Sequence, residues 1–132
     1  MDLQLEGKRA LITGSTAGIG YAIAESLVQE GAAVIVNGRT KQRVDAAVEK
    51  LRGRSSAAQI DSLSADLGTA AAVQQAIRQF PEVDILINNL GIFEPKPFEE
   101  ISDEDWFRFF EVNVLSGVRL SRYHLTRMKS RN

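Results

Sequence analysis

Residues 13–20 have the types and spacing that could do chemistry, because they place three glycines in one short turn, Thr-Gly-Ser-Thr-Ala-Gly-Ile-Gly. Gly14, Gly18 and Gly20 would let the chain turn sharply, bring bare backbone close to a ligand, and pack a following helix tightly on a sheet. The first turn of that helix would offer unpaired N–H groups and the positive end of its dipole to an anion. This pattern favours the binding of a phosphate, most naturally a pyrophosphate.

The glycine spacing, G-x-x-x-G-x-G, differs from two common phosphate-binding patterns. The usual dinucleotide fingerprint is G-x-G-x-x-G, and a P-loop ends in Gly-Lys-Ser or Gly-Lys-Thr. From the turn alone, a glycine-rich helix start without any ligand stays open as the alternative. The sequence on either side of the turn is needed to choose between a phosphate-binding turn and a helix start without a ligand.

Short apolar runs alternate with amphipathic segments along the chain, and these are the elements that must position the turn. The expected strands are residues 10–12, 33–36, 57–63 and 83–87. The expected helices run from Ile19 to Gly31, from Thr40 to Gly53, from Thr69 to Pro81, and from Ser102 to about Met128. This alternation predicts an α/β fold with a Rossmann-like, doubly wound parallel sheet in three α/β/α layers, formed by one domain over residues 1–132.

Polar and glycine residues follow each expected strand. They lie at residues 14–20, 37–40, 64–66 and 88–91. Ligands of doubly wound sheets bind beyond the carboxyl ends of the strands. The sequence therefore predicts one site where these four segments meet.

The long expected helix carries an asparagine within an apolar face. Trp106, Phe109, Phe110, Asn113 and Gly117 recur at the spacing of one helical face. A buried amide that bonds a neighbouring carbonyl explains such a residue as well as a functional role does. Periodicity alone leaves the two interpretations equal.

Taken together, these motifs resemble the short-chain dehydrogenase/reductase family over essentially the whole chain. Residues 13–20 match the family's cofactor turn, T-G-x-x-x-G-[IL]-G, and Asp66-Leu67 match the pair that contacts the adenine. Residues 88–91 match its N-N-A-G motif, with Leu90 in place of alanine, and Asn113 corresponds to its catalytic asparagine. The resemblance implies a cofactor site made of Gly14, Ser15, Thr16, Gly18, Ile19, Gly20, Arg39, Thr40, Asp66, Leu67, Asn89, Leu90 and Gly91.

The end of the second expected strand bears on cofactor choice. An NAD-preferring site usually has an acidic residue there, which bonds the ribose 2′-OH and repels a 2′-phosphate. This chain has Gly38 followed by Arg39 and Thr40. The guanidinium can pair with a 2′-phosphate, with the threonine as an extra donor, so NADP(H) is favoured over NAD(H). A solvated Arg39 that fits either cofactor is the alternative.

The resemblance implies an NADP(H)-dependent oxidoreductase that transfers hydride between the nicotinamide and a carbonyl or alcohol substrate. The alternative from another class is a non-catalytic dinucleotide-binding or sensory protein on the same fold. A third, an anion-binding structural domain, is disfavoured by the joint presence of Asp66, Asn89 and Asn113.

The family's catalytic serine and its Tyr-x-x-x-Lys motif are not found in these residues. Tyr123 is followed four residues later by Arg127, and arginine cannot share a proton as a tunable lysine can. We therefore expect the N-terminal cofactor-binding part of a longer enzyme, truncated after the fourth strand and the long helix and inactive by itself. His124 is expected to be a surface or interface residue without a metal.

Composition limits the remaining classes. The 16 basic and 17 acidic residues give a net charge of −1, which does not indicate nucleic acid or an anionic membrane as a partner. The sequence has no cysteine, no signal-like start and no apolar run of membrane-spanning length, so a cytoplasmic location is expected. The open edge at residues 83–87 and the long helix predict self-association. The family resemblance implies a dimer or tetramer for the intact protein.

Overall fold

The computed structural model describes residues 2–131, which form a four-stranded parallel sheet flanked by helices. The strands β1 (Arg9–Ile12), β2 (Ala33–Gly38), β3 (Ile60–Ser64) and β4 (Ile85–Ile87) lie in the order β3-β2-β1-β4. In the register of the sheet, Leu11 lies between Ile35 of β2 and Leu86 of β4. The Rossmann-like doubly wound sheet expected from the sequence is confirmed.

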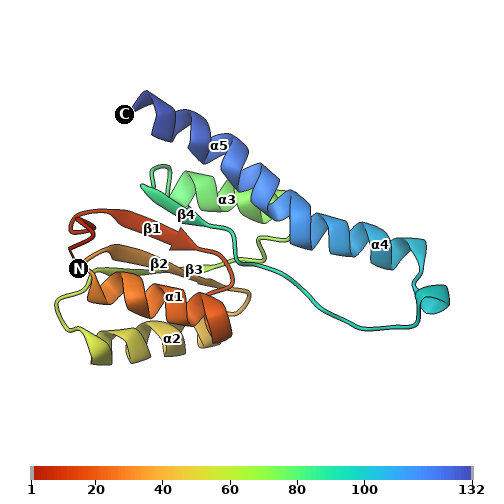
Figure 1. Ribbon diagram of the computed structural model, residues 1–132, viewed down its shortest axis with the longest axis horizontal. Helices are drawn as coiled ribbons and strands as arrows, with labels where there is room; N and C mark the ends of the chain where they lie inside the picture. The colour runs from red at the N-terminus through yellow and green to blue at the C-terminus, as the bar shows by residue number, and fades with distance from the viewer. Residues whose placement is uncertain (1, 132) are drawn as a thin grey trace.

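Helices cover both faces of this sheet, so the molecule has three layers (Figure 1). On one face lie α1 (Gly18–Gln29) and α2 (Lys41–Arg54), and on the other lie α3 (Ala70–Gln79) and α5 (Ser116–Ser130). The apolar run of the central strand β2 is continuous because both faces of this strand are buried. Val34 and Val36 pack with α1 and α2, whereas Ile35 packs in the cluster with α3 and α5, and all three are fully buried.

The predicted helix starts are confirmed by their caps. Thr40, Thr69 and Ser102 each accept a hydrogen bond from the backbone N–H three residues ahead, which satisfies a donor that the helix leaves free. Three predicted boundaries are wrong. Helix α2 runs through Gly53 to Arg54, β3 begins at Ile60 instead of residue 57, and β4 begins at Ile85 instead of residue 83.

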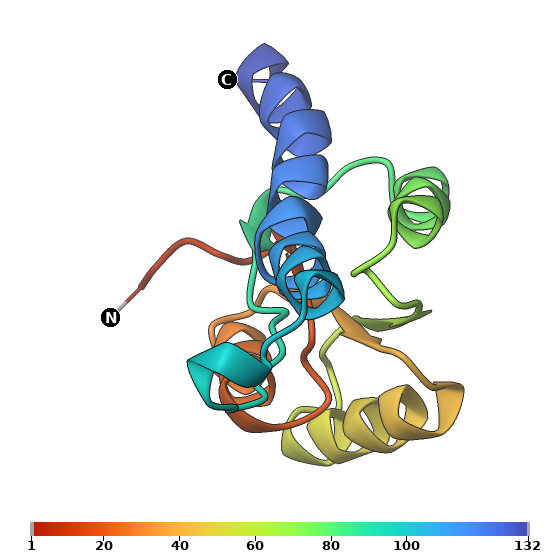
Figure 2. The ribbon, with the colours of Figure 1, turned by 90° about the vertical axis from the view of Figure 1, so that its right-hand side faces the viewer.

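The last helical stretch is continuous but not uniform. Helix α4 (Asp103–Phe110) passes into a π-helical turn, η2 (Glu111–Leu115), and then into α5. Figures 1 and 2 show these elements as one continuous helical stretch. The sequence pattern predicted one regular helix and did not reveal this turn. Single π-helical turns inside α-helices are frequently found at functional sites, and Asn113 lies at the centre of this one.

The apolar face predicted for this helix does not lie in the core. Trp106 and Phe110 are both more than half exposed, because α4 extends beyond the sheet (Figure 1). The buried side of α5 consists instead of Ser116, Leu120 and His124.

The expectation that His124 lies at the surface is wrong. Its side chain is 1% exposed and packs edge-on against the ring of Tyr123, whose hydroxyl donates to the Pro81 carbonyl. Burial, with smaller contributions from Arg127 and Arg131, lowers the pKa of His124 below its usual range. The i, i+4 spacing of Leu120 and His124 was the signal that could have revealed this position.

We predict that His124 makes the stability of the fold depend on pH. Because its pKa is lower in the folded chain than in the unfolded one, stability is complete above about pH 6.5 and decreases as the pH falls from there toward the folded pKa. The urea midpoint measured from pH 7.5 down to 5.5 is expected to fall in the native chain and to fall much less in His124→Gln. His124 is the only histidine, so an equal slope in both proteins would contradict the prediction.

Candidate functional site

The glycine-rich turn between β1 and α1 has a backbone that requires glycine. Gly14 and Gly18 have φ angles of 60° and 59°, in the left-handed region that side chains disfavour. A Cβ atom on Gly20 would lie 2.4 Å from the Gly14 carbonyl oxygen. Each glycine of the motif is therefore needed for the conformation of the turn.

A buried asparagine at the end of β2 holds this turn in place. The Gly14 N–H donates to Oδ1 of Asn37 at 2.9 Å. Nδ2 of the same side chain donates to the carbonyls of Leu63 and Ala65, at 3.0 and 3.1 Å. Asn37, only 1% exposed, thus ties the turn after β1 to the segment at the end of β3. The sequence analysis missed this role, although a single amide within an apolar run was a visible signal.

Ser15 is turned toward the protein interior. Its hydroxyl donates to the Ile12 carbonyl at 2.7 Å and accepts from the Asn37 N–H at 2.9 Å. The Ser15 N–H donates to the Asn37 carbonyl. Ser15, which was predicted as a cofactor-binding residue, therefore uses its side chain to hold the turn.

The end of β4 is fastened to the same turn through Thr13 and Asn89. Oγ1 of Thr13 accepts from the N–H groups of Asn89 and Leu90, at 3.0 and 2.9 Å. Nδ2 of Asn89 donates to the carbonyls of Thr13 and Gly14, at 3.2 and 3.0 Å. Leu90, where the family usually has alanine, packs against the core cluster that includes Leu120.

Helix α1 starts without a side-chain cap. Its N-cap is Ala17, and no acidic residue lies in its first turn, whereas α2, α3 and α4 each have a threonine or serine cap. Gly18 faces open space and Ile19 is exposed. The positive end of this helix therefore remains available to an anion.

The segment after β2 places Arg39 and Thr40 beside the turn. A Cβ atom on Gly38 would lie 2.5 Å from Cγ2 of Thr16, so the missing side chain lets Thr16 lie over the end of β2. Arg39 and Thr40 are exposed, and within residues 2–131 the Arg39 side chain has no hydrogen bond or ion pair.

The segment after β3 contributes Asp66 and Leu67. Asp66 is exposed and accepts from the Gly68 N–H through Oδ1 at 3.0 Å. Leu67 is fully buried, so only its backbone can face a ligand. A Cβ atom on Gly68 would lie 3.0 Å from Cγ2 of Val112, which brings this segment next to the π-helical turn.

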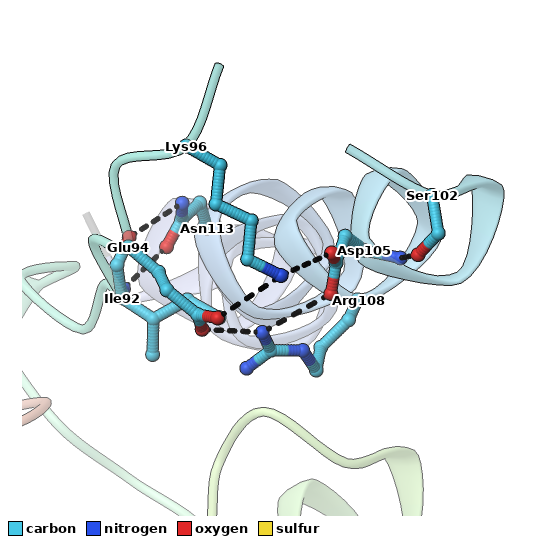
Figure 3. Close-up of polar contacts among 7 residues, drawn as sticks. All are labelled: Ile92, Glu94, Lys96, Ser102, Asp105, Arg108 and Asn113. Carbon is cyan, nitrogen blue, oxygen red and sulfur yellow. Dashed lines mark hydrogen bonds and ion pairs between the residues drawn. The ribbon is translucent and has the colours of Figure 1, made fainter. Parts of the chain in front are cut away.

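Asn113 is exposed and pairs with the loop that follows β4 (Figure 3). Its Oδ1 accepts from the Ile92 N–H at 2.7 Å, and its Nδ2 donates to the Ile92 carbonyl at 3.1 Å. The amide does bond a neighbouring carbonyl, but that carbonyl belongs to the loop and not to an apolar core. A Cβ atom on Gly91 would lie 3.3 Å from Oδ1 of Asn113, so these two predicted site residues are neighbours.

The predicted residues thus gather at the carboxyl edge of the sheet in two groups. The first group surrounds the turn and includes Gly14, Gly20, Asn89 and Leu90. The second group comprises the Asp66 segment, Gly91 and Asn113, which come together through contacts with η2.

Within residues 2–131, no group of three His, Cys, Asp or Glu side chains could hold a metal ion. None of the helices over the same residues is long and apolar enough to cross a membrane.

Comparison with known proteins agrees with this arrangement. The family model described as short chain dehydrogenase matches residues 8–132. The chain belongs to the short-chain dehydrogenase family.

Relatives in this family resemble the chain over nearly its whole length. The uncharacterized oxidoreductase YvaG of Bacillus subtilis is 52% identical over 97% of this chain and 48% of its own length. L-xylulose reductase of Bos taurus is 34% identical over 92% of this chain and 48% of its own length. The chain therefore spans about half the length of these short-chain dehydrogenase relatives.

A solved structure shows the same similarity. L-sorbose reductase from Gluconobacter frateurii, complexed with NADPH and L-sorbose, superposes with a TM-score of 0.91 at 34% identity. The match covers 99% of this chain and 51% of that reductase.

We predict that Asn37→Asp destabilises the fold strongly. The change replaces the two N–H donors to the Leu63 and Ala65 carbonyls with a carboxylate that faces both oxygens. We expect the free energy of unfolding in urea to fall by about 3 kcal/mol. The control is Asn88→Asp, whose exposed amide makes one hydrogen bond to Ser121, and which should cost less than about 1 kcal/mol. Equal losses in the two variants would contradict the role given to Asn37.

Proposed function

We propose that this chain binds NADP(H) at the carboxyl edge of its sheet and serves an oxidoreductase that transfers hydride between the nicotinamide and a carbonyl or alcohol substrate. The observation that carries the proposal is the uncapped start of α1 behind a glycine turn that Asn37 and Asn89 hold in place. Membership of a dehydrogenase family and the similarity to a reductase complexed with NADPH support it. The family relationship does not favour the non-catalytic alternative.

The residues of the site fit such a cofactor. The free N–H groups of Gly18, Ile19 and Gly20 would hold the pyrophosphate, because Gly18 leaves the space in front of them open. The Asp66 segment would bind the adenine, and residues 89–91 would line the path toward the nicotinamide. The cofactor itself would supply or accept the hydride.

Arg39 supports a preference for NADP(H). Its side chain is exposed beside the turn and has no partner within residues 2–131, so its charge is available to a 2′-phosphate. Thr40 accepts from the Arg43 N–H as a helix cap, and its hydroxyl hydrogen can still be donated to a phosphate oxygen. Neither Arg39 nor Thr40, which directly follow β2, is acidic, so no carboxylate at this position would repel that phosphate.

Asn113 is proposed as the catalytic residue of this part of the protein, where it would hold a water of the proton relay. The serine and the Tyr-x-x-x-Lys pair that complete the reaction are proposed to belong to a longer protein, since the relatives are about twice as long. By itself the chain is then expected to bind the cofactor without turning over substrate.

An apolar strip on the long helix supports self-association. Along α4, η2 and α5, the exposed apolar side chains are Trp106, Phe107, Phe110, Val114, Val118 and Leu125. A strip of this length on one helix is typical of an interaction surface. We propose that a second copy of the chain covers it, giving a homodimer or a tetramer.

Arg39→Asp is expected to reverse the cofactor preference. The new carboxylate repels a 2′-phosphate and accepts from a ribose 2′-OH, so NADPH affinity should fall about 10- to 100-fold while NADH affinity is kept or improved. Titration of the chain with each reduced cofactor, followed by nicotinamide fluorescence, measures both constants. Arg78→Asp, an exposed arginine on α3, is the charge-matched control. An unchanged ratio of the two constants in Arg39→Asp would refute the preference.

Val118→Glu is expected to shift the chain from an oligomer to a monomer, because it places a charge within the apolar strip. Sedimentation equilibrium of both proteins at several concentrations measures the mass. The control is Gln42→Glu, which adds the same charge at an exposed position of α2, on the opposite face of the sheet. A native chain that stays monomeric at every concentration would contradict the proposed association.

A further inference from the structure

Four charged side chains form a closed ring between the loop after β4 and helix α4 (Figure 3). Nζ of Lys96 lies 2.8 Å from Oδ2 of Asp105 and 3.3 Å from Oε1 of Glu94. The guanidinium of Arg108 lies 2.7 Å from Oε2 of Glu94 and 3.4 Å from Oδ1 of Asp105. Each cation therefore contacts both anions, and the charges alternate around the ring.

The ring continues directly into the pair formed by Ile92 and Asn113. Along the loop, Ile92, Glu94 and Lys96 are spaced by two residues, so in extended chain they point to the same side. Their partners on the helix run in the opposite direction: Lys96 meets Asp105, Glu94 meets Arg108, and Ile92 meets Asn113. The loop and the helix are thus joined by an antiparallel series of polar contacts.

The lengths of the two segments match. Four steps of extended chain, from residue 92 to 96, span about 13 Å. Eight residues of α-helix rise about 12 Å, and the segment from 105 to 113 is slightly shorter because its last residues belong to the π-helical turn. The three contacts can therefore form together without bending either segment.

Polar contacts, and not apolar burial, hold this loop. Phe93 and Phe98 are 90% and 78% exposed. Between residues 92 and 96, the hydrogen bonds and ion pairs that reach other parts of residues 2–131 are those of the series itself. Beyond Ile92, the loop is therefore held to the long helix by the ring.

Isolated pairs on a protein surface contribute little, but a closed network of this geometry is a recognised exception. Asp105 is only 18% exposed. Hydrogen bonds from Arg108 and then Lys96 lower the pKa of Glu94, and a hydrogen bond from Lys96 lowers the pKa of Asp105. Both carboxylates are thus stabilised in the charged form that the ring needs.

We propose that Glu94, Lys96, Asp105 and Arg108 are positioning residues, which hold the Ile92 backbone against Asn113 and so set the orientation of the Asn113 amide. The inference rests on the proposed function, because it is the role given to Asn113 that makes its orientation matter. The ring and the amide pair are then one device, built from the loop after β4 and the two helical turns before Asn113.

Hydrogen exchange of the Ile92 amide, measured by NMR on the chain without cofactor, tests the proposal. Arg108→Gln removes two contacts of the ring, and exchange is expected to become about five-fold faster. The side-chain amide resonances of Asn113 should shift in the same variant. Arg108→Lys keeps the charge and should restore both signals, and Arg122→Gln, on α5 and outside the ring, should change neither.

A salt titration of the native chain gives a test that needs no mutation. At about 1 M NaCl, where the screening length is about 3 Å, exchange at Ile92 should accelerate toward that of Arg108→Gln. The proposal would be overturned if the Ile92 amide exchanged in Arg108→Gln as slowly as in the native chain, or if Arg122→Gln accelerated it equally. It would also be overturned if Arg108→Lys did not restore the native exchange rate. Both signals are measured without NADPH, and dinucleotide binding is measured in a separate titration. A failure of the proposed function can therefore be distinguished from a failure of the proposed role of the ring.

Discussion

The buried amide of Asn37 is the interaction on which the site depends. It accepts from the turn after β1 and donates to two carbonyls at the end of β3, while its own strand lies between them. Backbone groups buried at strand ends are costly when unpaired, and one side chain satisfies three of them. Because the inner groups of the glycine turn are used in this way, its outward N–H groups stay free for a ligand.

Other side chains at the carboxyl edge also hydrogen-bond backbone groups of a neighbouring segment. Asn89 and Thr13 join the end of β4 to the glycine turn, and Asn113 joins the long helix to the loop after β4. Each fixes a segment that has little apolar burial of its own. The result is a site whose backbone is positioned before any ligand arrives, which lowers the entropy that binding must overcome.

Local patterns in the sequence predicted much of the fold. The alternation of apolar runs and helical periodicity indicated the sheet, and Thr40, Thr69 and Ser102 marked helix starts that are confirmed. The long-range features were not predictable in this way. Whether Ser15 faces inward, whether His124 is buried and whether Trp106 is exposed depend on which segments meet in space, and periodicity reports only which residues share a face. The π-helical turn around Asn113 likewise has no local signal.

The central claim is that the carboxyl edge of the sheet, and the turn that Asn37 holds, form a dinucleotide site. Amide resonances of the isotopically labelled chain, followed during titration with NADPH, test it most directly. The account predicts that the largest shifts fall at residues 14–20, at Asp66 and at residues 89–91, with smaller ones elsewhere. Shifts centred on the opposite, amino-terminal edge, where Glu6, Glu30 and Gln59 line a cavity of about 510 Å³, or no shifts at all, would contradict it.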